Sequence, residues 1–284
     1  MKIFDILIIG GGAAGIAAAK GAYDAGCRSI AIVDRKKNLG GVLLQCFHRG
    51  FGANQTGPEY TEKLLEKFPE TVTFYENTTV FTVTIEKTAH LSTGERIGFQ
   101  QLILATGCRE IPAGALPIAG TRPKGIYTAG QMQERLNLFG RIPEGPVVIL
   151  GSGDLGLVMA NHLVQAGLAV TLVEKKSACG GMARNQKCLS EYPIRLICNA
   201  TVTEVLGGKA LEGCILSTGE TLTCKTLLIA VGLVPDRELV LDLGEPDWLH
   251  ICGNCNRVHP MVEAVVNEGK TAGRNAWKQI RGNL

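Results

Sequence analysis

Two glycine-rich segments and two acidic residues are the parts of this sequence that point most directly to a chemistry. GGGAAG at 10–15 and GSGDLG at 151–156 both read G-x-G-x-x-G, and an acid follows the start of each after 24 and 23 positions, at Asp34 and Glu174. In this pattern the first glycine permits a tight turn, the second lets the main chain approach a pyrophosphate, and the third lets a helix pack on a strand. The acid accepts hydrogen bonds from a ribose. The spacing therefore predicts two dinucleotide sites.

Each glycine loop lies in the sequence context that this role requires. Apolar runs at 3–9 (IFDILII) and 147–150 (VVIL) lead into the loops, a small-residue helix pattern follows, and a second apolar run ends at the acid. Free N–H groups and the dipole at the start of such a helix favour a bound pyrophosphate. Each unit also closes with an apolar run that ends in a glycine, within 100–107 (QQLILATG) and 225–232 (KTLLIAVG). We therefore expect an α/β protein with two doubly wound Rossmann-like domains.

The composition describes a globular chain and argues against several classes of partner. The sequence has 284 residues and 45% hydrophobic content, enough to bury one or two domain cores. Its net charge is +3 and its basic residues are scattered among 26 acidic ones, so we expect no nucleic acid partner. Asp5 and the glycine loop interrupt the apolar run at 3–19, so we expect no signal peptide and no membrane span. Ten irregularly spaced cysteines then predict reduced thiols and a cytoplasmic protein.

Further motifs extend the pattern over the whole chain. They are GGGAAG with Asp34, the Gly40-Gly41 pair, LILATG, GSGDLG with Glu174, IAVGLVPD and a late CGN at 252–254. These resemble the two-dinucleotide-binding-domain flavoproteins, the pyridine nucleotide-disulfide oxidoreductase superfamily that includes thioredoxin reductase and glutathione reductase. GGVLLQCFHRGFG (40–52), TGPEY (56–60), GIYTAG (125–130), GGMARN (180–185) and ICGN followed by VH are similar to one branch. Its members accompany FAD-dependent glycerol-3-phosphate, amine or amino-acid dehydrogenases.

The resemblance implies FAD in the first domain, NAD(P)H in the second, and a chain that returns at its end to complete the flavin site. It places the flavin domain at 1–112 and 236–284, and the inserted nicotinamide domain at 113–235. Relatives hold the ribityl chain of the flavin with a glycine and an acid near the C-terminus, where this chain has Gly253 and Asn254. Asn can still donate and accept a hydrogen bond. We expect no C-terminal dimerisation domain, and the sequence leaves a homodimer open.

The expected cofactor-binding residues follow from the two loops and from the resemblance. For FAD they are Gly10, Gly12, Ala13, Ala14, Gly15, Asp34, Arg35, Gly41, Val42, Val80, Ala105, Thr106, Gly107, Gly253, Asn254 and Val262. For the nicotinamide nucleotide they are Gly151, Gly153, Asp154, Leu155, Gly156, Glu174, Lys175 and Gly232. Hydride transfer between two cofactors needs positioning by the protein and no acid or base. We therefore name no catalytic side chain, and we expect no metal site.

The acid of the second unit bears on the choice of nicotinamide nucleotide. A carboxylate at the end of the second strand suits a ribose 2′-OH and repels a 2′-phosphate, so Glu174 favours NAD. Lys175 and Lys176 follow directly and keep NADP open as the alternative.

The sequence has no cysteine pair where disulfide-reducing relatives carry one. Leu43 and His48 occupy the positions of the pair in glutathione reductase relatives, and the stretch that corresponds to the CxxC of thioredoxin reductases reads GIYTAGQMQERL. One CxxC exists, from Cys252 to Cys255, beside the expected flavin. We interpret it as a strand end and a turn, with a redox role as the alternative. Two cysteines alone cannot hold zinc.

Other reactive side chains lie near the expected flavin. Cys46 is interpreted as structural. His48 and Arg49 either line the mouth of the flavin site or belong to an ordinary solvated loop. His259, Pro260 and Glu263 are similar to the HPxxxE of glutathione reductases, with one residue fewer before the glutamate. That segment belongs to a dimerisation domain, so we interpret the similarity as coincidence. We expect His259 to open the final helix near the flavin edge.

Because the chain has no cysteine pair at the expected positions to take electrons from the flavin, we favour the interpretation that it is an electron-transfer subunit. Hydride would pass between NADH and FAD in this chain, and a partner dehydrogenase subunit or a small iron–sulfur protein would supply or take the electrons. The alternative is a self-contained enzyme, either a disulfide reductase that uses Cys252 and Cys255 or an NADH oxidase. A flavin-binding scaffold without turnover is disfavoured because the second glycine loop is intact.

Overall fold

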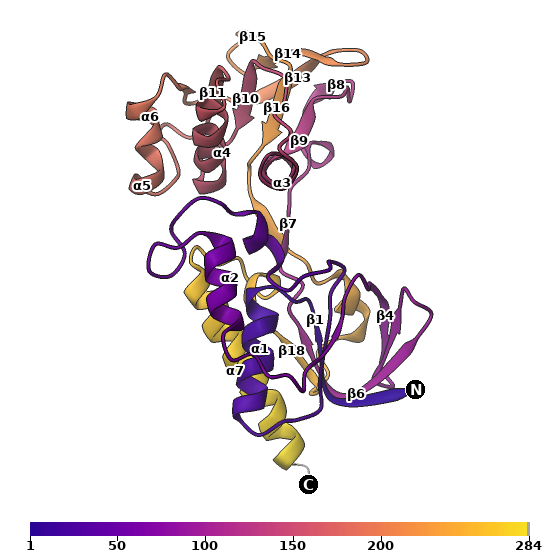
Figure 1. Ribbon diagram of the computed structural model, residues 1–284. Helices are drawn as coiled ribbons and strands as arrows, with labels where there is room; N and C mark the ends of the chain where they lie inside the picture. The colour runs from indigo at the N-terminus through magenta and orange to yellow at the C-terminus, as the bar shows by residue number, and fades with distance from the viewer. Residues whose placement is uncertain (283–284) are drawn as a thin grey trace. The chain divides into compact units, whose positions relative to one another are not determined.

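The computed structural model describes residues 1–282 and divides into two compact units (Figure 1). The first unit is Met1–Arg109 with Val234–Leu284, and the second is Glu110–Leu233. The sequence placed these borders at 112/113 and 235/236, a few residues later. The connecting segments pair with each other as the short strands β7 (Cys108–Glu110) and β17 (Leu233–Pro235), so the chain passes between units within a strand pair.

The first unit contains a sheet with the strand order β3-β2-β1-β6-β5-β4, and β18 also pairs with β6. Strands β3, β2, β1, β6 and β18 run parallel, whereas β4 and β5 form an antiparallel hairpin. The bounds are β1 Lys2–Ile9, β2 Ile30–Val33, β3 Thr73–Tyr75, β4 Val80–Thr84, β5 Thr88–Leu91, β6 Arg96–Leu104 and β18 Leu249–Ile251.

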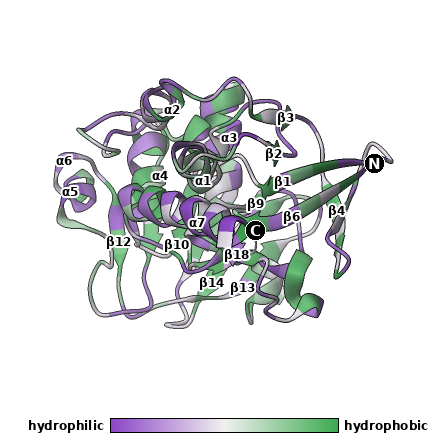
Figure 2. Cartoon of the chain, turned by 90° about the horizontal axis from the view of Figure 1, so that it is seen from below, coloured by the Kyte–Doolittle hydropathy of each residue, from purple (hydrophilic) through white to green (hydrophobic). Residues whose placement is uncertain are grey.

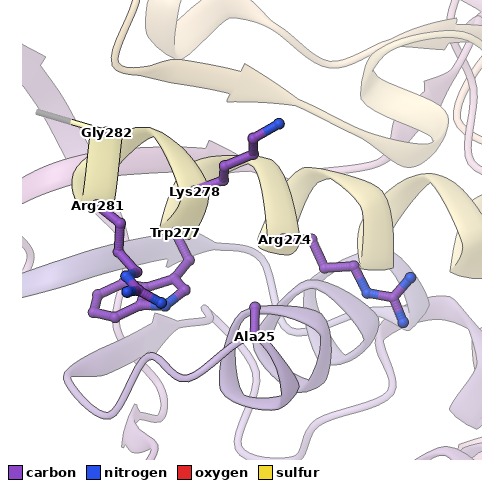
Figure 3. Close-up of a pocket in the computed structure, with 6 residues that line it drawn as sticks. All are labelled: Ala25, Arg274, Trp277, Lys278, Arg281 and Gly282. Carbon is purple, nitrogen blue, oxygen red and sulfur yellow. The ribbon is translucent and has the colours of Figure 1, made fainter.

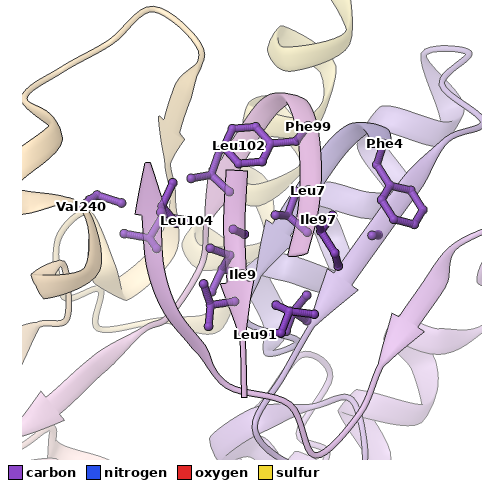
Figure 4. Close-up of a cluster of buried hydrophobic side chains, with 14 of the residues drawn as sticks. Phe4, Leu7, Ile9, Leu91, Ile97, Phe99, Leu102, Leu104 and Val240 are labelled. Atoms are coloured by element: carbon purple, nitrogen blue, oxygen red, sulfur yellow. The ribbon is translucent and has the colours of Figure 1, made fainter. Parts of the chain in front are cut away.

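The parallel part of this sheet is buried on both faces, which explains why its strands are continuous apolar runs. Leu7 and Ile9 of β1 belong to one core cluster, whereas Ile6 and Ile8 belong to the cluster on the opposite face. Figure 4 shows the first of these clusters, in which β1 and β6 contribute neighbouring side chains.

The helices of the first unit pack closely around the first glycine loop. They are α1 (Ala13–Asp24), α2 (Gly57–Leu65) and α7 (Val262–Gly282), with the short 3-10 turns η1 (Gly41–Gln45), η3 (Glu238–Leu243) and η4 (Gly253–Cys255). Helices α1 and α7 lie side by side (Figure 1). A Cβ on Gly269 would lie 2.3 Å from the carbonyl oxygen of Ala14, and one on Gly273 would lie 2.0 Å from that of Ala18. Glycine at both positions therefore lets the two main chains meet.

The second unit repeats the parallel sheet and adds a separate, mostly antiparallel one. Its parallel sheet has the order β12-β11-β10-β16-β9, with β9 Ile126–Thr128, β10 Val147–Leu150, β11 Val170–Val173, β12 Arg195–Ile197 and β16 Thr226–Ile229. The second sheet contains β8 Ala119–Gly120, β13 Val202–Gly207, β14 Leu211–Leu216 and β15 Thr221–Thr223, and in it only β8 pairs in parallel, with β13. The helical segments are η2 Ala113–Ala115, α3 Ala129–Phe139, α4 Asp154–Gln165, α5 Ala183–Gln186 and α6 Cys188–Glu191. The expected α/β class with two Rossmann-like domains is confirmed.

Among the helices of residues 1–282, none combines the length and the apolar composition that a membrane crossing requires.

We predict that Gly273→Ala lowers the free energy of unfolding by about 1–3 kcal/mol, the usual cost of forcing extra atoms into a packed interior. The new Cβ would lie against the Ala18 carbonyl oxygen and force α1 and α7 apart. Thermal unfolding of both variants checks this. Gly282→Ala is the matched control, because Gly282 lies in the same helix and a Cβ placed on it would lie in open space. This substitution should leave the melting temperature unchanged or raise it slightly. Equal effects of the two changes would contradict the packing argument.

Candidate functional site

The first glycine loop turns sharply at the end of β1. Gly10 has φ +104°, and a Cβ there would lie 2.4 Å from the carbonyl oxygen of Ala105. A Cβ on Gly15 would lie 1.9 Å from the carbonyl oxygen of Gly10, so both positions exclude any side chain. Gly12 differs, because its backbone is extended and no atom lies within 4 Å of a Cβ placed on it. The space in front of Gly12 is therefore the part of the loop where a ligand's phosphates could approach.

The helices that follow the two glycine loops begin without the side-chain caps that other helices have. Helices α2 and α3 open with complete capping boxes, formed by Thr56 with Glu59 and by Thr128 with Gln131. Within the described chain, no side chain caps α1 at Gly12 or α4 at Gly153. Their first N–H groups keep their donors for another acceptor, as an anion site at a helix start requires.

Asp34 ties the loop to the end of β2 and keeps acceptor capacity. Its Oδ2 accepts a hydrogen bond from the Gly11 N–H at 2.6 Å, and its Oδ1 accepts one from the Lys36 N–H at 2.7 Å. A carboxylate oxygen can accept two hydrogen bonds, so each retains one position for a sugar hydroxyl. Arg35 is exposed beside it. Gly11 is not among the predicted cofactor-binding residues, because its role comes from its N–H, which leaves no side-chain signal.

The double glycine lies directly against the first loop. Gly40 donates its N–H to the carbonyl oxygen of Gly11 at 2.8 Å. Gly41 has φ +56°, and a Cβ there would lie 3.0 Å from the Cα of Gly12. Val42 follows and is 62% exposed, so it offers an apolar surface next to the loop.

The end of the chain returns to the same place. Ala105 donates its N–H to the carbonyl oxygen of Ile9 beside the loop. Gly253 has φ +72°, and a Cβ there would lie 2.7 Å from the Cβ of Ala14. Val262, the first residue of α7, packs in one cluster with Ala13. The structure therefore brings the expected loop, closing-strand and C-terminal residues together.

Glu268 of α7 organises this returning segment, and the sequence analysis did not name it. Its carboxylate accepts hydrogen bonds from the Gly253 N–H at 3.0 Å and from the Asn256 side-chain amide, and it lies 2.6 Å from His259 Nε2. Burial, the largest influence, raises the pKa of Glu268, but hydrogen bonds from Asn256, His259 and Gly253 outweigh it and hold the pKa below its usual value.

The expectation that His259 opens the final helix is wrong. Helix α7 begins at Val262, and the His259 side chain is only 6% exposed because it turns inward onto Glu268. Asn254 is also engaged locally, since its Oδ1 accepts from the His259 N–H at 3.0 Å and its amide lies 3.7 Å from the Cys108 sulfur.

The other residues expected near the flavin have different structural roles. The Thr106 hydroxyl donates a hydrogen bond to the carbonyl oxygen of Asp236 at 2.6 Å. Gly107 follows with φ +79°, and a Cβ placed on it would lie in open space. Val80 is buried in the core cluster of the sheet. Arg49 lies 3.5 Å from Glu59 at the surface.

The second glycine loop repeats the geometry of the first. Gly151 has φ +105°, and a Cβ there would lie 2.4 Å from the carbonyl oxygen of Ala230. A Cβ on Gly156 would lie 2.2 Å from the carbonyl oxygen of Gly151, whereas Gly153 has open space. Gly232 follows the closing strand with φ +147°.

Glu174 is held more firmly than Asp34. It is only 8% exposed; its Oε2 accepts from both the N–H and the hydroxyl of Ser152, at 2.9 and 2.6 Å, and its Oε1 accepts from the Lys176 N–H at 2.9 Å. Burial, the largest influence, raises the pKa of Glu174, but these hydrogen bonds outweigh it and lower the pKa. One acceptor position remains on Oε1. Lys175 beside it is exposed.

A second double glycine completes the likeness between the two units. Gly180 and Gly181 start six positions after Glu174, just as the first pair starts six positions after Asp34. Gly180 donates its N–H to the Ser152 hydroxyl at 3.0 Å. Asp154 Oδ1 accepts from the Met182 N–H and from the Asn185 side chain, at 2.8 and 2.6 Å. Leu155 packs against the core. Comparing residues after each acid could have found this pair.

The cysteines near the first site are structural in their geometry. Cys252 and Cys255 are fully buried, and the Cys255 thiol donates to the carbonyl oxygens of Leu104 and Cys252, both at 3.1 Å. Burial raises the pKa of both thiols, and it raises the pKa of Cys46 to about 12. None of the ten cysteines is disulfide-bonded, and residues 1–282 contain no group of three or more potential metal ligands.

We predict that Glu268→Gln lowers the free energy of unfolding by about 1–3 kcal/mol at pH 7, because the neutral amide accepts fewer and weaker hydrogen bonds than the half-buried carboxylate. A carboxylate with a lowered pKa stabilises the fold above its unfolded value and loses that effect as pH falls through the folded pKa. The deficit should therefore shrink below about pH 4.5. Urea titrations between pH 3 and 7 measure it, with the exposed Glu62→Gln as control. A deficit independent of pH would contradict this role.

Comparisons with known proteins agree with the duplicated geometry. Thioredoxin reductase of T. acidophilum superposes with a TM-score of 0.82 over 99% of this chain and 100% of that one, at 20% identity, which shows a common fold. An opine oxidase subunit of Agrobacterium tumefaciens (strain Ach5) is 28% identical over 83% of this chain, which spans 54% of that protein. Rubredoxin-NAD(+) reductase of Pseudomonas putida is 24% identical over 84% of this chain and 64% of its own length. The family model described as pyridine nucleotide-disulphide oxidoreductase matches residues 4–247, and the chain therefore belongs to this family of FAD-containing, NAD(P)H-dependent oxidoreductases.

Proposed function

We propose that this chain holds FAD at the first glycine loop and NADH at the second, and passes electrons between them and a partner protein. The observation that carries the proposal is the pair of open glycines, Gly12 and Gly153, each at a helix start without a side-chain cap. Packing excludes side chains at the neighbouring glycines, but it does not explain why Gly12 and Gly153 are glycines. The need to leave room for the phosphates of a dinucleotide explains both.

The assignment of FAD to the first unit rests on the extra segments that meet its loop. Gly41, Gly253 and Val262 all lie against the loop or the first turn of α1. A ligand enclosed by three separate segments is suited to permanent binding. The N-terminus of α7 lies in the same place, and its dipole would favour negative charge on the flavin ring.

The assignment of NADH rather than NADPH rests on Glu174. Its carboxylate is fixed by Ser152 and Lys176 and keeps one acceptor position, which suits a single ribose hydroxyl. Its lowered pKa keeps it charged at neutral pH, where it would repel a 2′-phosphate.

When bound, FAD supplies the redox chemistry, by accepting a hydride from the reduced nicotinamide. The residues described above contribute binding and orientation. The starts of α1 and α4 donate N–H groups to phosphates, and Asp34 and Glu174 accept from ribose hydroxyls. The geometry assigns no proton transfer to any side chain.

The state of the cysteines supports the proposal that electrons leave through another protein. A thiol reacts in disulfide exchange as the thiolate. Cys252 and Cys255 are buried with raised pKa values, so neither is suited to accept electrons from a flavin and pass them on. The opine oxidase relative is named as one subunit of its enzyme, and rubredoxin-NAD(+) reductase is named for a protein substrate. Both names favour a partner here.

We predict that Gly12→Val abolishes flavin retention, whereas Gly153→Val leaves the protein yellow. Both positions have extended backbones and open space, so valine should fold normally at each. In Gly153→Val, anaerobic bleaching of the flavin by NADH should slow by about 100-fold or more, which corresponds to about 2.7 kcal/mol. The absorption spectrum and stopped-flow mixing with NADH measure the two effects, and NADPH serves as the comparison nucleotide. Loss of flavin in Gly153→Val alone would reverse the assignment of the two sites.

We predict that the isolated chain reduces an artificial electron acceptor with NADH at least about tenfold faster than it reduces DTNB, a small disulfide, because no reactive thiol is resident. The rate with O₂ is measured as the third acceptor, and the proposed role requires it to be slow as well. Cys255→Ser should leave all three rates unchanged. Steady-state NADH consumption measures them. A fast DTNB reaction that Cys255→Ser abolishes would instead establish a self-contained disulfide reductase, and fast O₂ consumption would establish an NADH oxidase.

A further inference from the structure

The C-terminal two thirds of α7 carries an unusual concentration of positive charge. Residues 269–282 contain Lys270, Arg274, Lys278 and Arg281 and no acidic residue. Their spacing of four, four and three positions places them on one face of the helix. All four are exposed, and within the described residues none forms an ion pair or a side-chain hydrogen bond. We call these four residues the basic strip; Figure 2 shows the predominantly hydrophilic colour of α7.

A groove runs beside the basic strip and contains an aromatic side chain. It has a volume of about 440 Å³ and is lined by Ala25, Arg274, Trp277, Lys278, Arg281 and Gly282. Figure 3 shows Trp277 and Arg281 on the side of α7 that faces Ala25, with Arg274 further along the helix. The indole also packs against the core of α1 and β1, and its Nε1 lies close to Gly26, so its position is fixed. The groove thus has an apolar wall and a cationic rim.

We propose that the basic strip and its groove are a docking surface for an acidic helix of a partner protein, with one apolar side chain of that helix seated against Trp277. This inference rests on the proposed function, since it names the chemistry of the partner that function requires. The strip spans 12 residues, or about 16 Å along the helix axis from the first to the last, which is the length of three turns of an opposing helix. A buried apolar anchor surrounded by charged contacts is the usual anatomy of a specific protein interface.

The charge pattern favours an acidic protein over other anions. Unpaired cations of one sign attract an acidic surface and fix its register, because like charges are repelled. Among the described residues, no acidic side chain forms a salt bridge with any of the four cations of the strip. A membrane-binding helix would need a broad apolar face, whereas here a single aromatic ring lies in a concave groove.

The basic strip lies away from the proposed flavin site, toward the other end of the same helix. Helix α7 begins beside Gly253, at the proposed flavin site, and its 21 residues are about 30 Å long. The strip occupies the C-terminal two thirds of the helix. Changes there should alter partner binding and leave the reduction of the flavin by NADH untouched.

The test uses the full-length flavoprotein and a synthetic helical peptide of about 18 residues. The peptide has four glutamates at the spacing of the strip, one leucine between them and a fluorescein label. Fluorescence anisotropy measures its affinity for the wild type, Lys278→Glu, Arg274→Glu and the control Lys63→Glu, an exposed lysine near the end of α2. We expect each strip variant to weaken binding by about tenfold or more, and Lys63→Glu to change it less than about twofold. Replacing the peptide's leucine with glutamine should also weaken binding several-fold, and higher salt should weaken it further.

Three outcomes would overturn the proposal: no binding of the peptide, equal weakening by Lys63→Glu, or binding to phosphatidylserine vesicles without binding to the peptide. NADH bleaching of the flavin is recorded on the same preparations. Normal bleaching without peptide binding refutes the docking surface alone. Peptide binding without bleaching refutes the proposed function and retains the docking surface.

Discussion

The close approach of each glycine loop to the carbonyl oxygen at the end of the neighbouring parallel strand is the constraint on which both units depend. Gly10 meets Ala105 and Gly151 meets Ala230, each so closely that a Cβ would lie 2.4 Å from the oxygen. Any side chain there would push the loop off the sheet and take the start of the following helix with it. The open space at Gly12 and Gly153 exists because the main chain around it is fixed in this way.

The two copies of this geometry differ in what surrounds them. Around the first loop, Gly41 and Gly253 bring two further segments of chain to the same place, and Asp34 keeps an acceptor position on each oxygen. Glu174 in the second unit accepts three hydrogen bonds and is almost fully buried. A more enclosed first site and a stiffer, simpler second site accord with one resident and one exchanging nucleotide.

The parts of the fold that could be predicted are those that depend on residues close together in the sequence. The loops, their acids and the apolar runs lie within about 30 residues of each other, so their pattern predicts both units. Glu268 left no such signal, because one glutamate in a helix resembles any other until the fold places Gly253 and Asn256 against it. For the same reason His259 was misplaced: its inward turn depends on that carboxylate. The two units of the structure meet at β7 and β17, which are short and have no periodicity by which the sequence could place a border to the residue.

The packing that keeps Cys252 and Cys255 from acting as a redox disulfide also forms part of the proposed flavin site. Cys252 directly follows β18, which pairs with β6, and donates its N–H to the carbonyl oxygen of Leu104. Gly253 comes next and lies against Ala14. To expose either thiol, β18 would have to leave the sheet and the Cys255 thiol would have to release the Leu104 carbonyl. That movement would also withdraw Gly253 and the hydrogen bond it donates to Glu268. Thiol chemistry at this CxxC would therefore dismantle the returning segment of the proposed flavin site, and this packing is the physical reason why the proposed function assigns the electrons to another molecule.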